Sequence, residues 1–412
     1  MHHFEYRDGK LFAEEANVTD LAEKFGTPLY VYSAATFRRH FKAFDSAFSG
    51  LDHLTCYSVK ANSNLSVLKM LAEEGAGMDI VSGGELYRAL KAGVAPEKIV
   101  YSGVGKRSSE IKEALTAGIL MFNVESVAEL RRIDEVAKEM GLVARVSFRI
   151  NPDVDPQTHP YISTGMKKNK FGLDIDSSLE AYKLAAELEN VEPIGMDCHI
   201  GSQLTSIEPF LEALEKLLNF YEKLKGLGIE IKYLDLGGGL GIPYEEEEPP
   251  HPSEFGKALM NKLADVPLTV ILEPGRVIAG NAGIMVTEVV YTKSNPSKNF
   301  LIVDAAMNDL IRPSLYSSYH RIDEVEQRGR DNQEYDVVGP ICESTDFLAR
   351  DRELPGIEEG ELLAVFSAGA YGFTMASNYN SRPRACELIV DGDKVIVARK
   401  RESYEDLIEK EL

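Results

Sequence analysis

The sequence predicts an α/β domain, a (β/α)8 TIM barrel, followed by a C-terminal antiparallel β domain. Between about residues 54 and 280, short apolar runs alternate with segments whose apolar residues recur at helical spacing. About eight such units in this length favour a closed barrel. Beyond residue 280, apolar runs follow one another through turns, without long helices between them. An open, doubly wound sheet is the alternative for the first part, because it shows the same alternation.

The expected barrel strands are short and apolar, and helical patterns separate them. They cover residues 54–59, 78–81, 99–101, 120–123, 145–150, 194–200, 233–236 and 268–272. Several helix starts are indicated by a serine that a glutamate follows three residues later. This pattern occurs at Ser82 and Glu85, at Ser126 and Glu129, and at Ser177 and Glu180. Gly93 and Gly118 follow periodic segments, where a glycine commonly ends a helix.

The β domain is expected from six further runs and two hairpin signals. The runs cover residues 284–292, 299–305, 334–338, 362–368, 385–390 and 394–398. Asp391-Gly392-Asp393 is typical of a hairpin turn, and so is Asp8-Gly9 between residues 4–6 and 10–12. We therefore expect an N-terminal segment, 1–30, that joins the β domain, a cofactor-binding barrel at 31–280, and a β-sandwich or β-barrel domain at 281–412.

Composition and charge limit the class of protein. The 412 residues, 44% of them hydrophobic, suffice for more than one core. A net charge of −21 repels phosphate backbones and anionic lipids, so neither nucleic acid nor a membrane is an expected partner. The four cysteines form no C-x-x-C pair, which fits a reducing compartment. With no apolar leader or membrane-spanning run, we expect a cytoplasmic protein.

The chemistry is expected at the carboxyl ends of the barrel strands, where barrel enzymes place it. The groups at these ends are Lys60, Asp79, Asn123, Arg149, His199, Gly237, Gly238, Gly239 and Glu273. A desolvated lysine such as Lys60 can act as an amine nucleophile in Schiff-base chemistry. A lysine at a strand end can also simply extend to solvent.

Each of the other groups also has a structural alternative. The turn from Gly237 to Gly241 does not fit G-x-G-x-x-G or a P-loop, but its N–H groups could hold a phosphate. It could also be only a tight turn. His199 could be a core histidine, and Ser202 could be a helix cap. Glu273 ends an apolar strand and needs a partner, either Arg276 or a protonated pyridine nitrogen.

Together these groups match the four needs of pyridoxal 5'-phosphate. The cofactor needs a lysine for its aldehyde, donors for its phosphate, a side chain stacked on its ring, and a carboxylate at its ring nitrogen. These four needs are met, in the same order, by Lys60, by the glycine turn with Ser202, by His199 and by Glu273. The combination predicts a pyridoxal-phosphate enzyme.

The sequence resembles the group III, alanine-racemase-like pyridoxal-phosphate decarboxylases, and within them the diaminopimelate branch. The matching motifs lie at 57–62, 158–163, 169–172, 199–203, 236–241, 273–276, 312–320, 339–346, 368–372 and 378–382. The resemblance covers nearly the whole chain, and it implies a barrel followed by a β domain. It also implies decarboxylation of meso-2,6-diaminopimelate to L-lysine and CO2, the last step of lysine biosynthesis, by a homodimer.

The resemblance implies a role for each matching residue. Lys60 binds the cofactor, His199 stacks on its ring, Arg149 lies near the ring hydroxyl, and Glu273 pairs with the ring nitrogen. The phosphate ligands are Ser202, Gly237, Gly238, Gly239 and the backbone of Glu273, Pro274, Gly275 and Arg276. The substrate ligands are Arg276, Arg312, Tyr316 and Tyr371, of which Tyr371 also contacts the cofactor. Cys342, the proton donor, and Glu343, the ligand of the distal ammonium, come from the neighbouring subunit.

Other activities of the same superfamily remain as alternatives. A decarboxylase of ornithine, lysine or carboxynorspermidine is the nearest. Arg312 and Tyr316 with Glu343 favour a substrate whose distal end carries both a carboxylate and an ammonium. An amino-acid racemase is expected to carry arginine at the position of Glu273. A non-catalytic pyridoxal-phosphate-binding protein is expected to lack the β domain, Lys60 or Cys342.

Overall fold

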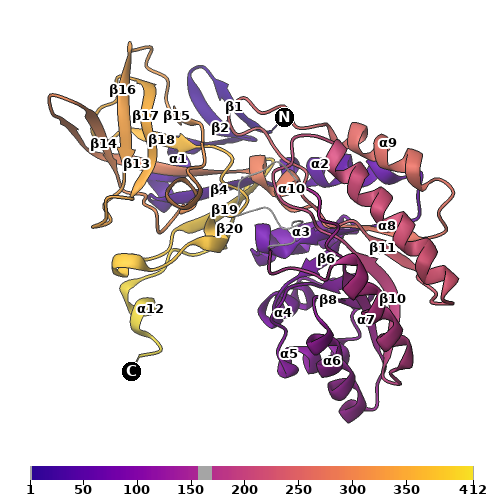
Figure 1. Cartoon of the computed structure of the whole chain (residues 1–412). Coiled ribbons are helices and arrows are strands. Elements are labelled where there is room, and N and C mark those ends of the chain that lie inside the picture. The colour runs from indigo at the N-terminus through magenta and orange to yellow at the C-terminus, as the bar shows by residue number, and fades with distance from the viewer. Residues whose placement is uncertain (1, 156–168, 412) are drawn as a thin grey trace. The chain divides into compact units, whose positions relative to one another are not determined.

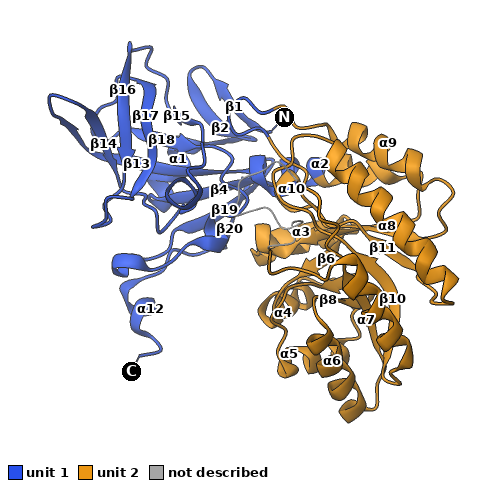
Figure 2. Ribbon diagram, viewed as in Figure 1, with its two compact units in different colours: residues 1–40, 243–247, 278–412 blue, residues 41–242, 248–277 orange. Residues whose placement is uncertain are grey.

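The computed structural model describes residues 2–155 and 169–411. The 158–163 motif therefore lies outside the described residues. The chain divides into two compact units, coloured separately in Figure 2. Unit 1 comprises Met1–His40, Pro243–Glu247 and Ile278–Leu412, and unit 2 comprises Phe41–Ile242 and Glu248–Val277.

Unit 2 contains a closed barrel of eight parallel strands (Figure 1). In order they are β5 (His53–Ser58), β6 (Gly77–Ile80), β7 (Ile99–Tyr101), β8 (Met121–Val124), β9 (Ala144–Arg149), β10 (Val191–Asp197), β11 (Tyr233–Asp235) and β12 (Thr269–Leu272). Each strand pairs with the next, and β12 pairs with β5. The predicted barrel is confirmed, and the open sheet is excluded because the pairing returns to its first strand.

Helices connect these strands, as the alternating pattern predicts. They are α3 (Leu65–Glu73), α4 (Gly83–Lys91), α5 (Ser108–Ala117), α6 (Val127–Met140), α7 (Ile175–Glu187), α8 (Glu208–Gly226), α9 (Pro252–Leu263) and the short α10 (Arg276–Ala279) after β12. Ser82 and Ser126 cap α4 and α6 as expected. Ser177 is not a cap, because Asp174 accepts the first free N–H groups of α7 and leaves Ser177 inside the first turn.

The barrel interior is apolar around its middle and polar at the carboxyl ends of its strands. The apolar cluster consists of Cys56, Val100, Leu120, Met121, Ile194 and Ile271. Ser58 and Asp79 mark the polar end, and both are buried. The apolar layer supports the fold, and the polar end is free to carry chemistry.

Unit 1 is built on a nine-stranded sheet of order β17-β16-β14-β13-β4-β19-β20, with β15 and β18 paired to one another and β18 to β13. The bounds are β4 (Leu29–Ser33), β13 (Gly283–Ser294), β14 (Asn299–Val303), β15 (Ile322–Glu324), β16 (Asn332–Val338), β17 (Phe347–Pro355), β18 (Leu362–Val365), β19 (Cys386–Asp391) and β20 (Lys394–Arg399). The sheet is mostly antiparallel, but β14 pairs with β16, and β19 with β4, in parallel.

The N-terminal segment that belongs to the β unit is longer than the predicted 1–30. Strand β4 lies between β13 and β19, so residues 31–40 fall in unit 1 instead of starting the barrel. The fully buried residues of β4 form this central strand, and its backbone bonds on both sides fix it there. Helix α2 (Ala34–Asp45) then runs from unit 1 into unit 2.

The predicted N-terminal hairpin is confirmed. Strands β1 (Phe4–Arg7) and β2 (Lys10–Ala13) pair around Asp8 and Gly9, whose φ angles are 49° and 75°. β2 also pairs with β3 (Ala16–Asn17), and α1 (Val18–Phe25) follows. Phe4 and Leu11 share one core cluster with Ile284 and Leu388, so the hairpin is part of the β unit.

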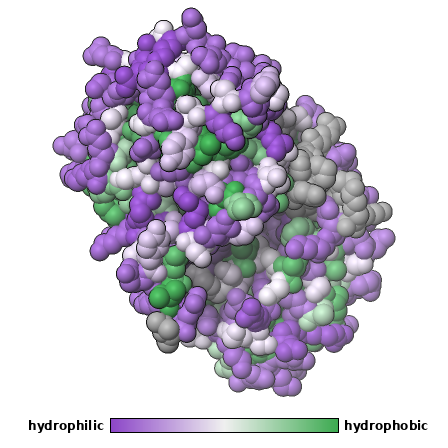
Figure 3. Space-filling model, turned by 90° about the vertical axis from the view of Figure 1, so that its left-hand side faces the viewer, coloured by the Kyte–Doolittle hydropathy of each residue, from purple (hydrophilic) through white to green (hydrophobic). Residues whose placement is uncertain are grey.

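The surface agrees with the high content of charged residues. The face drawn in Figure 3 is mostly hydrophilic, and its apolar residues lie in small separate groups. Across residues 2–155 and 169–411, no helix has the length and apolarity that a bilayer crossing requires.

Candidate active site

Lys60 lies just beyond the first barrel strand, in a 3-10 helix (Val59–Ala61). Its Nζ is 2.5 Å from Oδ2 of Asp79, a residue with no exposed surface. Asp79 is the register partner of Ser58 on the next strand, and the Ser58 hydroxyl donates to the same oxygen at 2.8 Å. The lysine side chain keeps 35% exposure. A buried carboxylate therefore fixes an amine that a small molecule can still reach.

Glu273 follows the last barrel strand and is 5% exposed. Its Oε1 accepts hydrogen bonds from the Ser102 hydroxyl at 3.3 Å and from Nδ2 of Asn123 at 3.4 Å. Nδ2 of Asn123 also lies 3.1 Å from Oδ2 of Asp235. Burial, and then the charges of Asp235 and Asp79, raise the pKa of Glu273 well above its usual range. A cation placed beside Glu273 would reverse that effect.

The glycine turn lies between His199 and Glu273. Gly237 has φ +63°, and its N–H donates to Oδ1 of Asp235 at 2.9 Å. The N–H of Gly238 donates to Nδ1 of His199 at 3.2 Å. A Cβ on Gly238 would collide with the carbonyl oxygen of Glu273, so this position requires glycine. Gly239, at φ +119°, requires glycine for its conformation.

His199 is a neutral ring in this setting. Burial, and then the charge of Arg149, lower its pKa well below the usual range. A neutral imidazole can accept the Gly238 N–H at Nδ1, as the geometry requires. Arg149 also donates to the carbonyl oxygen of His199 at 3.3 Å, and it pairs with Glu125 at 3.0 Å. The histidine is thus held on two sides at the end of the barrel.

Residues 273–276 connect β12 to the start of α10. The N–H of Ser58 donates to the carbonyl oxygen of Pro274 at 3.0 Å. Gly275 is buried, and Arg276 is 6% exposed. Nη2 of Arg276 donates to the Ser202 hydroxyl at 3.0 Å. Arg276, which the sequence left open as a partner of Glu273, thus contacts Ser202, an expected phosphate ligand.

Arg312 and Tyr316 lie on the short helix α11 (Arg312–Tyr316) of unit 1, four residues apart. Arg312 is 5% exposed although it carries a charge. Its guanidinium carbon lies 4.7 Å from the ring centroid of Tyr244 and 6.0 Å from that of Tyr316. Nη2 donates to the Ser318 hydroxyl at 3.2 Å. Two aromatic rings and the hydroxyl of Ser318 therefore contact this cation.

The other expected substrate groups of unit 1 lie in two loops. Cys342 and Glu343 follow β16 and are exposed. Hydrogen bonds from the hydroxyl groups of Thr345 and Tyr379 lower the pKa of Glu343. Tyr371 follows β18 and has φ +55°, an uncommon conformation for a non-glycine residue that often marks a functional position.

The structure thus gathers one set of expected residues at the barrel end of unit 2 and carries a second set on unit 1. The first set is Lys60, Arg149, His199, Ser202, Gly237, Gly238, Gly239, Glu273, Pro274, Gly275 and Arg276, and the second is Arg312, Tyr316, Cys342, Glu343 and Tyr371. The strand-end pattern assigned no role to Asp79 or Asn123, and Ser102 and Asp235 were not among the expected site residues. The signal was a polar residue at or just after the end of an apolar strand.

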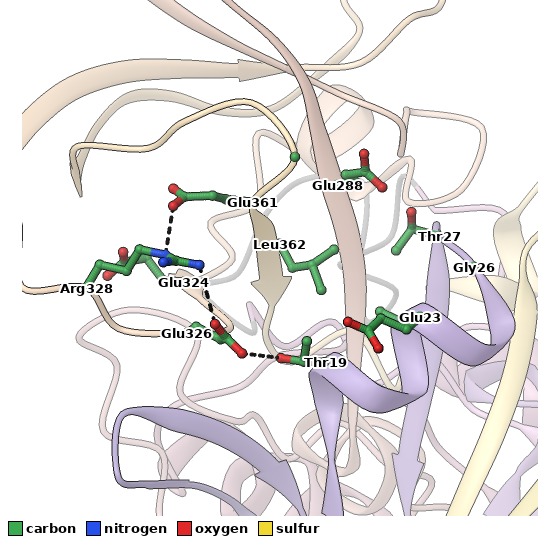
Figure 4. A pocket seen from close by; sticks show the side chains of 12 residues that line it. Thr19, Glu23, Gly26, Thr27, Glu288, Glu324, Glu326, Arg328, Glu361 and Leu362 are labelled. Atoms are coloured by element: carbon green, nitrogen blue, oxygen red, sulfur yellow. Dashed lines mark hydrogen bonds and ion pairs between the residues drawn. The ribbon is translucent and has the colours of Figure 1, made fainter.

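A separate cavity of about 520 Å³ lies within unit 1 (Figure 4). Thr19, Glu23, Glu288, Glu324, Glu326, Arg328, Glu361 and Leu362 are among the residues that line it. Arg328 pairs with Glu361 at 2.8 Å and with Glu326 at 3.4 Å, so the negative charge of the cavity lining is partly neutralised. None of the expected site residues lines this cavity. No cluster of metal-binding side chains occurs within the described ranges.

Sequence and fold match known proteins over nearly their full length. Residues 34–280 match the family model described as "Pyridoxal-dependent decarboxylase, pyridoxal binding domain". The chain is 54% identical over 409 residues to a diaminopimelate decarboxylase of Haemophilus influenzae, covering 99% of this chain and 98% of that relative.

Two solved structures are similar to the whole chain. Diaminopimelate decarboxylase from Helicobacter pylori, complexed with L-lysine, has a TM-score of 0.93 and 46% identity, covering 96% of this chain and 99% of that one. The M. jannaschii diaminopimelate decarboxylase, in co-complex with L-lysine, has a TM-score of 0.95 and 43% identity, covering 99% and 97%. The chain therefore belongs to the pyridoxal-dependent decarboxylases and, within them, to the diaminopimelate decarboxylase family.

Proposed function

We propose that this protein removes CO2 from meso-2,6-diaminopimelate to give L-lysine, with pyridoxal 5'-phosphate as its cofactor. The observation that carries the proposal is the group formed by Lys60, His199, the glycine turn and Glu273 at one end of the barrel. Family membership supports it, because the relatives named diaminopimelate decarboxylase match the full chain. The L-lysine in two similar structures is the expected product.

The barrel end fits the phosphate of such a cofactor. The turn packs so closely on the carbonyl oxygen of Glu273 that Gly238 has no room for a Cβ. A glycine-rich turn of this kind can present backbone N–H groups to an anion. Ser202, whose hydroxyl accepts from Arg276 at 3.0 Å, would add a hydroxyl group, and the backbone of residues 273–276 would complete the phosphate site. Lys60 would bond to the cofactor aldehyde, and Asp79 would fix the direction of its amine.

The ring of the cofactor would lie among residues suited to it. His199 is neutral and half-buried, so it can stack on a heteroaromatic ring without an opposing charge. Arg149 would lie near the ring hydroxyl. Glu273 would become ionised beside the protonated ring nitrogen, because a cation offsets the burial that raises its pKa. Bound pyridoxal phosphate supplies an electron sink for the pair that departing CO2 leaves on Cα.

Unit 1 would recognise the distal end of the substrate and supply a proton. Arg312 and Tyr316, with Arg276, would bind the distal carboxylate, and Glu343 would bind the distal ammonium. Tyr371 would contact both cofactor and substrate. The thiol of Cys342 would donate a proton to Cα after CO2 has left. A diamine precursor has no distal carboxylate for Arg312 to bind, which disfavours ornithine or lysine as the substrate.

We further propose that Cys342 and Glu343 act in the active site of a second subunit in a homodimer. Mixing inactive Lys60→Ala and Cys342→Ala proteins tests this, because a two-fold dimer contains two equivalent composite sites. After random exchange, each mixed dimer holds one site with both lesions and one with neither, so roughly a quarter of all sites should regain parental activity. No recovery after verified subunit exchange would reject the shared site.

One assay tests the activity itself. Purified protein with pyridoxal phosphate is given meso-diaminopimelate, ornithine or lysine in parallel, and CO2 release is followed. We expect release from diaminopimelate alone or in large excess over the other two. Preferred release from ornithine or lysine would refute the substrate, and racemisation without CO2 would refute the reaction.

A further inference from the structure

Two consecutive residues, Tyr379 and Asn380, hold two consecutive residues of the loop after β16, Glu343 and Cys342. We propose that Tyr379, Asn380 and Thr345 are positioning residues. Tyr379 and Thr345 orient the Glu343 carboxylate toward an ammonium group, and Asn380 holds the Cys342 backbone so that its thiol is placed for proton transfer. This inference rests on the roles proposed above for Glu343 and Cys342. It adds the residues through which those two groups would be aligned.

Both carboxylate oxygens of Glu343 accept a hydrogen bond from a neutral hydroxyl. The Tyr379 hydroxyl donates to Oε2 at 2.7 Å, and the Thr345 hydroxyl donates to Oε1 at 2.6 Å. Among the described residues, no lysine, arginine or histidine forms an ion pair with Glu343. The two hydroxyl groups therefore fix the carboxylate and favour its charged form without neutralising it. A fixed and uncompensated anion suits a cationic ligand such as a primary ammonium.

Cys342 is held through its backbone. Its N–H donates to Oδ1 of Asn380 at 3.0 Å, and the residue stays exposed. Asn380 has φ +55° and ψ +28°, a left-handed conformation that asparagine tolerates better than most residues. This conformation belongs to the segment Tyr379–Ser381, so the two contacts with the loop come from one turn of chain.

Each partner in this contact is anchored independently. Asn378, next to Tyr379, donates to Oε2 of Glu402 at 2.7 Å and to the carbonyl oxygen of Arg382 at 3.1 Å. On the other side, Asp346 accepts the N–H groups of Ile341 and Met307, both at 2.7 Å. The two anchored segments meet at Glu343 and Cys342. A small displacement at reacting groups can cost a large factor in rate, so this alignment should be measurable.

Kinetics of hydroxyl variants test the Glu343 contact. Tyr379→Phe should raise KM for diaminopimelate about tenfold, the scale of one hydrogen bond to a charged group, and leave kcat within about twofold. The acid limb of kcat/KM should move to higher pH, because the Glu343 pKa loses a contact that lowers it. Thr345→Val should act likewise, and Thr345→Ser should keep parental values. Tyr404→Phe, at an exposed tyrosine, is the matched control.

A measurement without activity tests the Cys342 contact. Asn380→Ala should speed hydrogen–deuterium exchange in a peptide covering residues 340–346, because the Cys342 amide loses its acceptor. Unchanged exchange in Asn380→Ala, or unchanged KM and pH profile in Tyr379→Phe, overturns the inference. If the parent protein releases no CO2 from diaminopimelate, the proposed function fails, and exchange together with a crystal structure of Tyr379→Phe decides the positioning role. A Glu343 carboxylate in its original place in that structure overturns it.

Discussion

Replacing Glu273 with glutamine should slow decarboxylation strongly while cofactor stays bound. The amide oxygen of glutamine can still accept from Ser102 and Asn123, which lie 3.3 and 3.4 Å from Oε1 in the parent. The loss is therefore confined to the negative charge beside the ring nitrogen. An electrostatic contribution of this kind is worth roughly 3 kcal/mol, so the rate should fall about a hundredfold or more.

The same substitution should not destabilise the protein without cofactor. Because burial and neighbouring acids raise the pKa of Glu273, the folded state favours its neutral form. Glutamine supplies a neutral group of the same size, so thermal unfolding of the cofactor-free variant at neutral pH should match or exceed that of the parent. A large loss of stability would show that the rate loss reflects damage to the fold.

The assay combines cofactor content with turnover. Absorbance gives the bound cofactor per chain, and CO2 release from meso-diaminopimelate gives kcat at saturation. Glu273→Asp, which keeps a carboxylate, should retain more activity than Glu273→Gln at equal cofactor content. A glutamine variant that is fully loaded and nearly as fast as the parent would refute the role of Glu273 at the ring nitrogen.

Three further substitutions give separate expected outcomes. Lys60→Ala should abolish turnover and the long-wavelength absorbance of bound cofactor, and a borohydride-reducible linkage surviving in it would point to another lysine. Arg312→Ala should lower kcat/KM for diaminopimelate by a factor that corresponds to roughly 2–4 kcal/mol of transition-state binding. Equal activity of variant and parent would reject the distal-carboxylate role. Burial raises the pKa of Glu85 to about 7, so thermal stability of the parent should fall as pH rises from about 4.5 through 7. Glu85→Gln should remove that part of the decline, and an unchanged pH profile would contradict it.

The barrel could be predicted because a local pattern of apolar residues marks each of its strands and helices. Apolar runs bounded by turns gave all eight strands to within a few residues, and chain order gave their neighbours. The strand-end rule then located Lys60, Glu273 and the glycine turn. The β unit was harder, because β17 carries Arg350, Asp351 and Arg352 in a row and resembles a loop. Its pairing with β16, not its composition, makes it a strand.

The hydrogen bonds that orient the site could not be predicted, because they cross the barrel. Asn123 on β8 approaches Glu273 after β12, although these strands are not neighbours. Asp235 joins this contact to the glycine turn by binding both Asn123 and the N–H of Gly237. Only closure of the barrel brings the three together. A strand-end pattern marks each residue as polar and buried but does not say which others it meets.

The exposure of Cys342 and Glu343 bears on where they act. Both are exposed in their own chain, and the Glu343 carboxylate carries an uncompensated charge there. In water an ion pair at such a carboxylate contributes little, and a proton donor competes with solvent. Selective binding of a distal ammonium and directed protonation at Cα both require these groups to be covered. A second subunit placed over this loop would supply that cover. The proposed homodimer would therefore account for the exposure of both residues in the single chain.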